Sequence, residues 1–133
     1  MLYTGPSSAT SDGIRLILVD DDAAVRRSLK FALELENFQV DAFASAEDLL
    51  HSPVRPDTGC LLLDYRLPGL NGLELLEVLR ERRVTAPALL MTTQPDRLLR
   101  ESAARAGAPI VEKPLLGNAL VSAIRERIAG NAA

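Results

Sequence analysis

Three short apolar segments of this chain end in charged side chains. The first runs into Asp20, Asp21 and Asp22, the second into Asp64, and the third into Lys113, one of only two lysines among 133 residues. Acids gathered in one site repel each other unless a cation or a changed pKa relieves the repulsion. Mg²⁺ prefers oxygen ligands and assists phosphoryl transfer, and Mn²⁺ accepts the same ligands. These residues therefore predict a divalent-metal site that accepts a phosphoryl group.

Asp64 is the candidate nucleophile of this site. A metal ion shared with an incoming phosphoryl group would allow the carboxylate to attack and form an acyl phosphate. Asp20 and Asp21 are the candidate metal ligands, whereas Asp22 is assigned to the cap of the following helix, where Asp is favoured. The hydroxyl of Thr92 would hydrogen-bond a phosphoryl oxygen, although a threonine at a strand end also commonly satisfies the backbone. The ammonium of Lys113 would pair with Asp64 before the reaction and with the phosphoryl group after it.

Apolar segments and helical patterns alternate five times along the chain. Strands are expected at residues 15–20, 38–43, 59–64, 87–91 and 109–112, with helices at 23–36, 46–50, 73–82, from Pro95 to a stop at Gly107, and at 116–129. Short apolar segments between helices are typical of buried parallel strands. The alternation predicts an α/β fold of the (βα)5 doubly wound type, with helices on both faces of a parallel sheet. In such sheets the functional groups gather at the carboxyl ends of the strands.

Composition indicates a single soluble globular domain. The net charge of −3, without a basic stripe, argues against direct nucleic-acid binding. Residues 1–13 lack the basic and apolar stretches of a signal peptide or a membrane span, so neither is expected there, and Cys60 is the only cysteine, which fits a reducing cytoplasm. We expect a disordered lead-in at residues 1–13, the domain at 14–129 and a tail at 130–133. His51 and the arginine-rich residues 80–83 are interpreted as solvated surface.

The charged segments, in this order and spacing, resemble the response-regulator receiver domain of two-component signalling. The resemblance covers residues 15–128 and includes the sequence Asp-Tyr-Arg-Leu-Pro-Gly-Leu-Asn-Gly at 64–72 and the Lys113-Pro114 pair. It implies a flavodoxin-like strand order 2-1-3-4-5 and gives each charged residue a role. By this resemblance Asp64 is phosphorylated, Asp20, Asp21 and the backbone carbonyl of Arg66 bind the metal, Thr92 is the switch hydroxyl, and Lys113 contacts the phosphate.

The resemblance also implies partners. A sensor histidine kinase would donate the phosphoryl group, and the domain would switch partner binding or form a homodimer through the fourth helix, fifth strand and fifth helix. Residues 25–29 and 43–50 are similar to receivers that precede LuxR-type DNA-binding domains. Ile110 and Thr93 depart from the family pattern, which usually has an aromatic residue and a small residue at these positions.

Two other functions remain open. A degenerate receiver would act as a constitutive interaction domain, which Ile110 and Thr93 allow. A phosphatase that forms an aspartyl-phosphate would need an acid two residues after Asp64 to protonate a leaving group, and Arg66 stands there. The receiver interpretation treats the domain as catalysing only its own phosphorylation and dephosphorylation.

Overall fold

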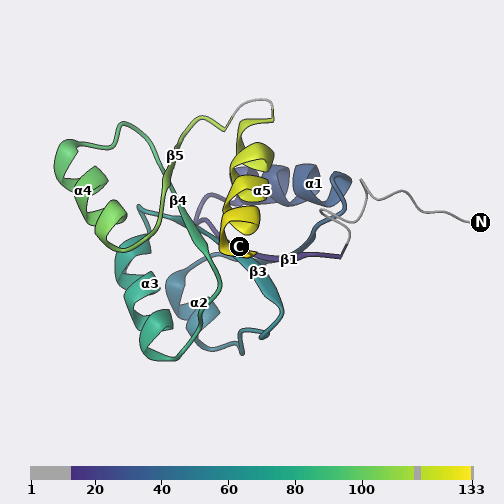
Figure 1. Ribbon diagram of the computed structural model, residues 1–133, viewed down its shortest axis with the longest axis horizontal. Coiled ribbons are helices and arrows are strands. Elements are labelled where there is room, and N and C mark those ends of the chain that lie inside the picture. Colours follow the sequence, from purple (N-terminus) through teal and green to yellow (C-terminus); the bar gives the residue numbers. More distant parts are fainter. Residues whose placement is uncertain (1–12, 116–117, 133) are drawn as a thin grey trace, which may run out of the picture.

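The computed structural model describes residues 13–115 and 118–132, with side chains described through residue 130. Five strands alternate with five helices within these residues (Figure 1). The strands are β1 (Arg15–Val19), β2 (Gln39–Phe43), β3 (Thr58–Asp64), β4 (Ala88–Thr92) and β5 (Ile110–Glu112). The helices are α1 (Ala23–Leu35), α2 (Ala46–Leu50), α3 (Gly72–Glu81), α4 (Arg97–Arg105) and α5 (Ala119–Ala132). All strand pairs are parallel, in the order β2-β1-β3-β4-β5, which confirms the predicted fold and topology.

The sheet is buried on both faces because successive strand residues alternate between two hydrophobic clusters. In β3, Leu61 and Leu63 pack with α2, α3 and α4, whereas Cys60 and Leu62 pack with α1 and α5. Figure 1 shows the same division, with α1 and α5 on one side of the sheet and the other three helices on the opposite side. This double burial explains why the central strands read as continuous apolar segments instead of alternating ones.

Capping side chains and left-handed backbone residues set the ends of several helices. Asp22 caps α1 by accepting hydrogen bonds from the backbone N–H groups of Ala24 and Val25, as predicted. Ser45 caps α2 by accepting a hydrogen bond from the N–H of Asp48. Asn37 and Gly107 follow α1 and α4 with φ angles of 72° and 70°, a left-handed conformation that favours these two residue types. Capping thus fixes the loops that carry the charged residues.

Four local expectations differ from the structure. The fourth helix starts at Arg97 and not at Pro95, because Asp96 accepts the N–H of Leu99 and acts as its cap. The fifth helix continues to Ala132, so residues 130–132 extend the helix beyond the expected end at 129. The helical spacing of Val25, Leu29, Ala32 and Leu33 in the sequence favours one buried face for α1, but Ala32 is exposed. Arg80 is half-buried and donates to the carbonyls of Val84 and Ala86, so it is not a free surface cation.

Residues 1–12 of the lead-in expected at 1–13, and the expected start of the last helix at Leu116, lie outside the described residues. The other strand and helix boundaries fall close to their predicted positions. Within the described part of the chain, no helix has the length and hydropathy needed to cross a membrane.

Candidate functional site

The register of the central strands brings Asp20 and Asp64 to the same edge of the sheet. Val19 at the end of β1 pairs with Leu63 of β3, so the next residue of each strand is an aspartate. Both carboxylates are buried, with 0% and 4% of their residue surface exposed. Burying two carboxylates side by side is unfavourable unless each one is paired. A positive charge must therefore reach this edge.

Lys113 supplies that charge from β5, two strands away from β3. Its Nζ donates to Oδ2 of Asp20 at 3.1 Å and to Oδ2 of Asp64 at 3.0 Å. The other oxygen of each carboxylate accepts a backbone N–H, from Asp22 to Asp20 at 3.0 Å and from Arg66 to Asp64 at 3.3 Å. All four oxygens of the buried pair thus have partners. The predicted contact between Lys113 and Asp64 is present, and the contact with Asp20 was not foreseen.

Asp21 completes the acidic cluster from an exposed position. One carboxylate oxygen from each of Asp20, Asp21 and Asp64 lies within 4.8 Å of the others, a spacing that can hold a metal ion. Three carboxylates and one ammonium leave an excess of negative charge, which suits a hard divalent cation with oxygen ligands. The backbone of Arg66 lies beside this cluster through its N–H contact with Asp64, while its side chain is exposed.

Thr92 lies next to the cluster at the end of β4. The side chain is buried, and its hydroxyl donates to the carbonyl of Thr93 at 3.3 Å. The strand register places Thr92 opposite Glu112, the residue before Lys113. Thr93 itself is exposed. The structure therefore brings all the predicted side chains to one edge, with the Thr92 hydroxyl engaged by the backbone.

Two residues that support the cluster were missed in the sequence. Arg26 of α1 donates from Nη1 to the backbone carbonyl of Asp20 at 2.7 Å, which ties the helix to the acidic loop. A Cβ on Gly72 would lie 2.5 Å from the carbonyl oxygen of Asp64, so only glycine allows α3 to approach this strand end. The turn-rich sequence around Gly72 was a signal for a loop but not for this contact, and an arginine on a helix gives no signal of its target.

Burial raises the pKa of Asp64, whereas pairing with the carboxylates determines the pKa of Lys113. For Asp64, burial raises the pKa above the ordinary value of 3.8, and the nearby charge of Asp20 acts in the same direction, while Lys113 opposes it. For Lys113, burial would lower the pKa, but the hydrogen bonds to Asp64 and Asp20 outweigh it and the pKa is raised above 10.5. The ammonium thus stays charged and partly offsets the cost of ionising Asp64.

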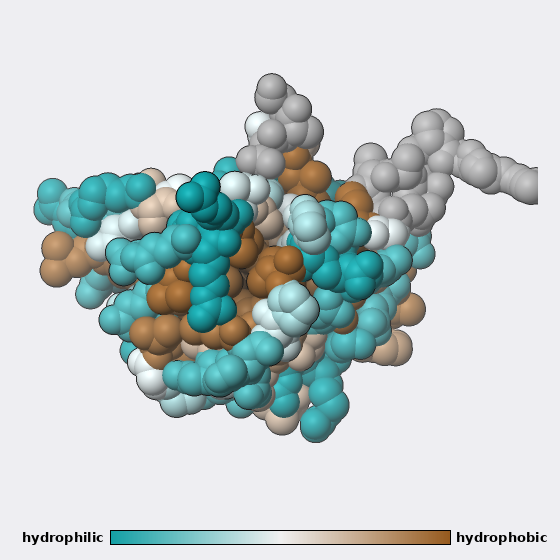
Figure 2. Space-filling view, turned by 90° about the horizontal axis from the view of Figure 1, so that it is seen from below, coloured by the Kyte–Doolittle hydropathy of each residue, from teal (hydrophilic) through white to brown (hydrophobic). Residues whose placement is uncertain are grey.

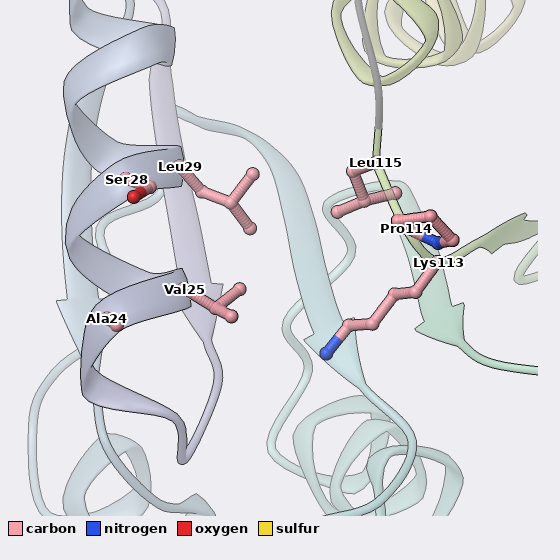
Figure 3. Close-up of a pocket in the computed structure, with 7 residues that line it drawn as sticks. All are labelled: Ala24, Val25, Ser28, Leu29, Lys113, Pro114 and Leu115. Carbon is pink, nitrogen blue, oxygen red and sulfur yellow. The ribbon is translucent and has the colours of Figure 1, made fainter.

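An apolar groove of about 320 Å³ opens beside the charged cluster. Figure 3 shows Val25 and Leu29 of α1 pointing across it toward Leu115, with the aliphatic stem of Lys113 at one end. The lysine therefore presents carbon to the groove and nitrogen to the carboxylates, as long cationic side chains commonly do. A hydrophobic surface thus leads directly to the polar site.

The pairing with Lys113 gives a prediction for the Lys113→Met variant. Without the ammonium, the pKa of Asp64 should rise further, because the group that opposes the effect of burial is gone. A carboxyl group whose pKa is higher in the folded than in the unfolded state loses stability as the pH rises through the folded pKa. The variant should therefore be less stable than wild type at neutral pH, by up to ~3–5 kcal/mol, and the deficit should shrink toward pH 4.

The measurement is urea unfolding in chelator at several pH values, together with a carboxyl-carbon NMR titration of Asp64. Lys30→Met is the matched control, because the other lysine forms an exposed ion pair with Glu34 on α1. A deficit for Lys113→Met that stays constant with pH would contradict the assigned coupling to Asp64.

Comparison with known proteins identifies relatives of the chain. It is 38% identical over 116 residues to the transcriptional regulatory protein FixJ of Azorhizobium caulinodans, an alignment that covers 86% of this chain and 55% of that protein. Among solved structures, the response regulator StyR superposes with a TM-score of 0.79 at 34% identity, over 90% of this chain and 61% of the other. A CheY-like receiver domain protein from Methanospirillum hungatei gives a TM-score of 0.82 at 28% identity, over 91% and 98% of the two chains.

The match to the family covers most of the chain. The chain spans about half the length of the FixJ relative, whereas it covers nearly all of the Methanospirillum receiver domain. The response regulator receiver domain family matches residues 16–125, which include the whole acidic cluster and Lys113. The chain therefore belongs to the response regulator receiver domain family of two-component signalling.

Proposed function

We propose that Asp64 accepts a phosphoryl group from a sensor histidine kinase in a Mg²⁺-dependent reaction, and that phosphorylation switches partner binding or dimerisation. The observation that carries this proposal is the cluster at the carboxyl edge of the sheet, where Asp64 lies within 4.8 Å of Asp20 and Asp21 and 3.0 Å from Lys113. A buried carboxylate at a strand end beside two further acids and an ammonium is suited to take up a phosphoryl group. The family relationship supports the same role.

The residues of the chain have separate tasks in this reaction. An oxygen of Asp64 attacks phosphorus, the bond from phosphorus to the imidazole nitrogen of the donor breaks, and an acyl phosphate forms. Lys113 releases Asp64 and pairs with a phosphoryl oxygen, since its ammonium has more than one hydrogen to donate. The hydroxyl of Thr92, which donates to the carbonyl of Thr93 in the structure, would instead donate to a phosphoryl oxygen.

Asp20, Asp21, Asp64 and the backbone carbonyl of Arg66 would hold Mg²⁺, with Mn²⁺ as a substitute. The bound ion would screen the negative charge that the phosphoryl group meets in an acidic site. The excess of carboxylates over ammonium groups supports this assignment.

The apolar groove beside Lys113 supports a protein as the physiological donor. A small phosphate ester makes no use of Val25 and Leu29, whereas a protein segment that carries phosphohistidine could cover them. We place the reaction in the cytoplasm, where a receiver meets the kinase. The degenerate-receiver alternative predicts no phosphorylation of Asp64 and constitutive partner binding.

Incubation with acetyl phosphate and Mg²⁺ tests the proposed chemistry. The wild-type chain should gain the mass of one phosphoryl group, and Asp64→Asn should gain none, because the amide is not a nucleophile of this kind. Asp57→Asn is the control, since Asp57 is an exposed aspartate away from the cluster. Intact-mass spectrometry reads the result. Labelling of Asp64→Asn, or equal labelling of the wild type in excess chelator, would refute the proposal.

Substitutions at two neighbouring aspartates distinguish the role in metal binding from the role in helix capping. Asp21→Ala should weaken Mg²⁺ binding far more than Asp22→Ala, because Asp21 lies in the acidic cluster and Asp22 caps α1. Asp22→Ala should instead lower stability by ~1 kcal/mol, the usual effect of losing a cap. Metal titration and thermal unfolding of both variants measure the difference. Similar Mg²⁺ affinities for the two variants would show that the metal assignment is wrong.

The proposed homodimer would use the face formed by α4, β5 and α5. On this face Ile110 is half-buried, and Arg100 of α4 pairs with Glu112 of β5 at 2.7 Å. An isoleucine has less apolar area to bury or expose than an aromatic ring, so phosphorylation should change this surface only modestly. Coupling near the lower end of the usual range of ~1–3 kcal/mol is expected.

Analytical ultracentrifugation with and without beryllofluoride measures this coupling. The dimerisation affinity should change less than a hundredfold, which corresponds to about 2.7 kcal/mol. Ile110→Tyr should enlarge the response, because a cavity of about 310 Å³ beside Ile110 leaves room for a ring. A hundredfold or larger change in the wild type would contradict the expectation.

A further inference from the structure

A second polar site lies at the edge of the sheet opposite Asp64. Two loops that lead into the amino ends of β3 and β4 enclose a pocket of about 220 Å³. Val54, Arg55 and Pro56 line it from one loop, and residues 82–86 line it from the other. Both loops lie at the bottom of Figure 1, and Figure 2 shows the molecule from that side, with hydrophobic residues recessed among hydrophilic ones. We call this feature the arginine pocket.

The charge of the arginine pocket contrasts with that of the chain. Arg55, Arg82 and Arg83 are among its lining residues and no acid is, although the whole chain carries a net charge of −3. Arg55 has only a long contact of 3.7 Å with Asp57, and Arg82 uses Nη1 for the carbonyl of Leu50. Most of their N–H donors therefore remain available, because each guanidinium has five.

Arg83 adds an observation from the backbone. It follows the C-cap of α3 with a φ of 67°, the position that Asn37 occupies after α1 and Gly107 after α4. Asparagine and glycine tolerate this left-handed conformation, whereas an arginine is disfavoured there. Within the described residues, the Arg83 side chain also has no hydrogen-bond or ion-pair partner. A long cation thus occupies a position where a smaller residue would be more stable, without any contact that explains it.

The walls of the arginine pocket are held in place before any ligand arrives. Arg80 donates to the carbonyls of Val84 and Ala86 at 2.8 and 2.7 Å, which fixes one wall. On the other wall, the carbonyl of Arg55 accepts both the N–H and the hydroxyl of Thr58. The bond from Arg82 to Leu50 joins the end of α3 to the end of α2. Binding to preformed walls loses less conformational entropy than binding to mobile loops.

We propose that the arginine pocket binds a diphosphate group, either free pyrophosphate or the terminal diphosphate of a larger molecule. Guanidinium groups bind phosphate oxygens in pairs of parallel hydrogen bonds. Two phosphate groups, at roughly −1.5 to −2 each, balance three arginines better than one does. The volume of about 220 Å³ falls below the ~300–1,000 Å³ of usual ligand pockets, which favours a small group such as a diphosphate over a larger molecule. Thr85 adds a hydroxyl and a backbone N–H to the lining.

NMR titration of the ¹⁵N-labelled chain tests this proposal. Pyrophosphate, orthophosphate, sulfate and ADP are added separately in chelator, so that metal at the Asp64 edge takes no part. The amides of Thr85 and Ala86 and the Nε–H groups of Arg55, Arg82 and Arg83 should shift on addition of pyrophosphate. Its affinity should exceed those of orthophosphate and sulfate at least tenfold. If ADP binds as tightly as pyrophosphate, the ligand is the terminal diphosphate of a larger molecule. If ADP binds more weakly, the ligand is free pyrophosphate. Either result supports the site.

Arg83→Gly is the informative variant because it removes the charge and relieves the left-handed backbone. It should melt at the same temperature as wild type or higher, and should bind pyrophosphate at least tenfold more weakly. Arg55→Gln, on the other wall, should weaken binding without changing the fold. The matched control is Arg97→Gln, which removes an exposed arginine of α4 and should leave the affinity unchanged.

Three results would overturn the proposal. The first is an Arg83→Gly variant that binds pyrophosphate as tightly as wild type. The second is an affinity for orthophosphate or sulfate equal to that for pyrophosphate. The third is a set of NMR shifts spread over all surface arginines. None of these results bears on the phosphorylation of Asp64, which is read by mass at the opposite edge of the sheet.

Discussion

The pairing of one ammonium with two buried carboxylates is the interaction on which the site depends. Asp20 and Asp64 are nearly inaccessible to solvent and lie side by side on adjacent strands, so their charges repel in a medium that screens poorly. Lys113 contacts both at about 3 Å. One ammonium leaves part of this repulsion uncompensated, and a divalent cation held by the acidic cluster would relieve it. The electrostatics of the site therefore favours the binding of a cation.

The fold serves this pairing by setting distances between residues far apart in the chain. Lys113 is 93 residues from Asp20 and 49 from Asp64, and they meet because parallel strands end at one edge. β4 separates the lysine from Asp64, and the long lysine side chain spans that gap. Gly72 and Arg26 support the acids from two helices, one by leaving space and the other by binding a backbone carbonyl. Each element therefore contributes to the geometry of the charged edge.

The two ends of the sheet carry opposite charge. Acids lie at the carboxyl ends of β1 and β3, whereas arginines gather in the loops before β3 and β4. Half-buried Arg80 holds the loop before β4 by hydrogen bonds to the carbonyls of Val84 and Ala86, so this part of the basic end is a structured surface. A diphosphate bound there would not compete with the phosphoryl group at Asp64, because the length of the strands lies between the two sites.

The sequence by itself determined the α/β alternation, because a strand buried on both faces must be apolar throughout, as in residues 60–63. It also determined Asp22 as a cap, since capping is a local interaction between neighbours in the chain. Only the tertiary structure decided that Lys113 contacts Asp20 as well as Asp64, that Arg26 binds the carbonyl of Asp20, and that Arg80 is half-buried. The Lys113 contacts depend on the register of strands across the sheet, and the two arginine contacts depend on the direction that each side chain takes from its helix, which the residue pattern does not encode.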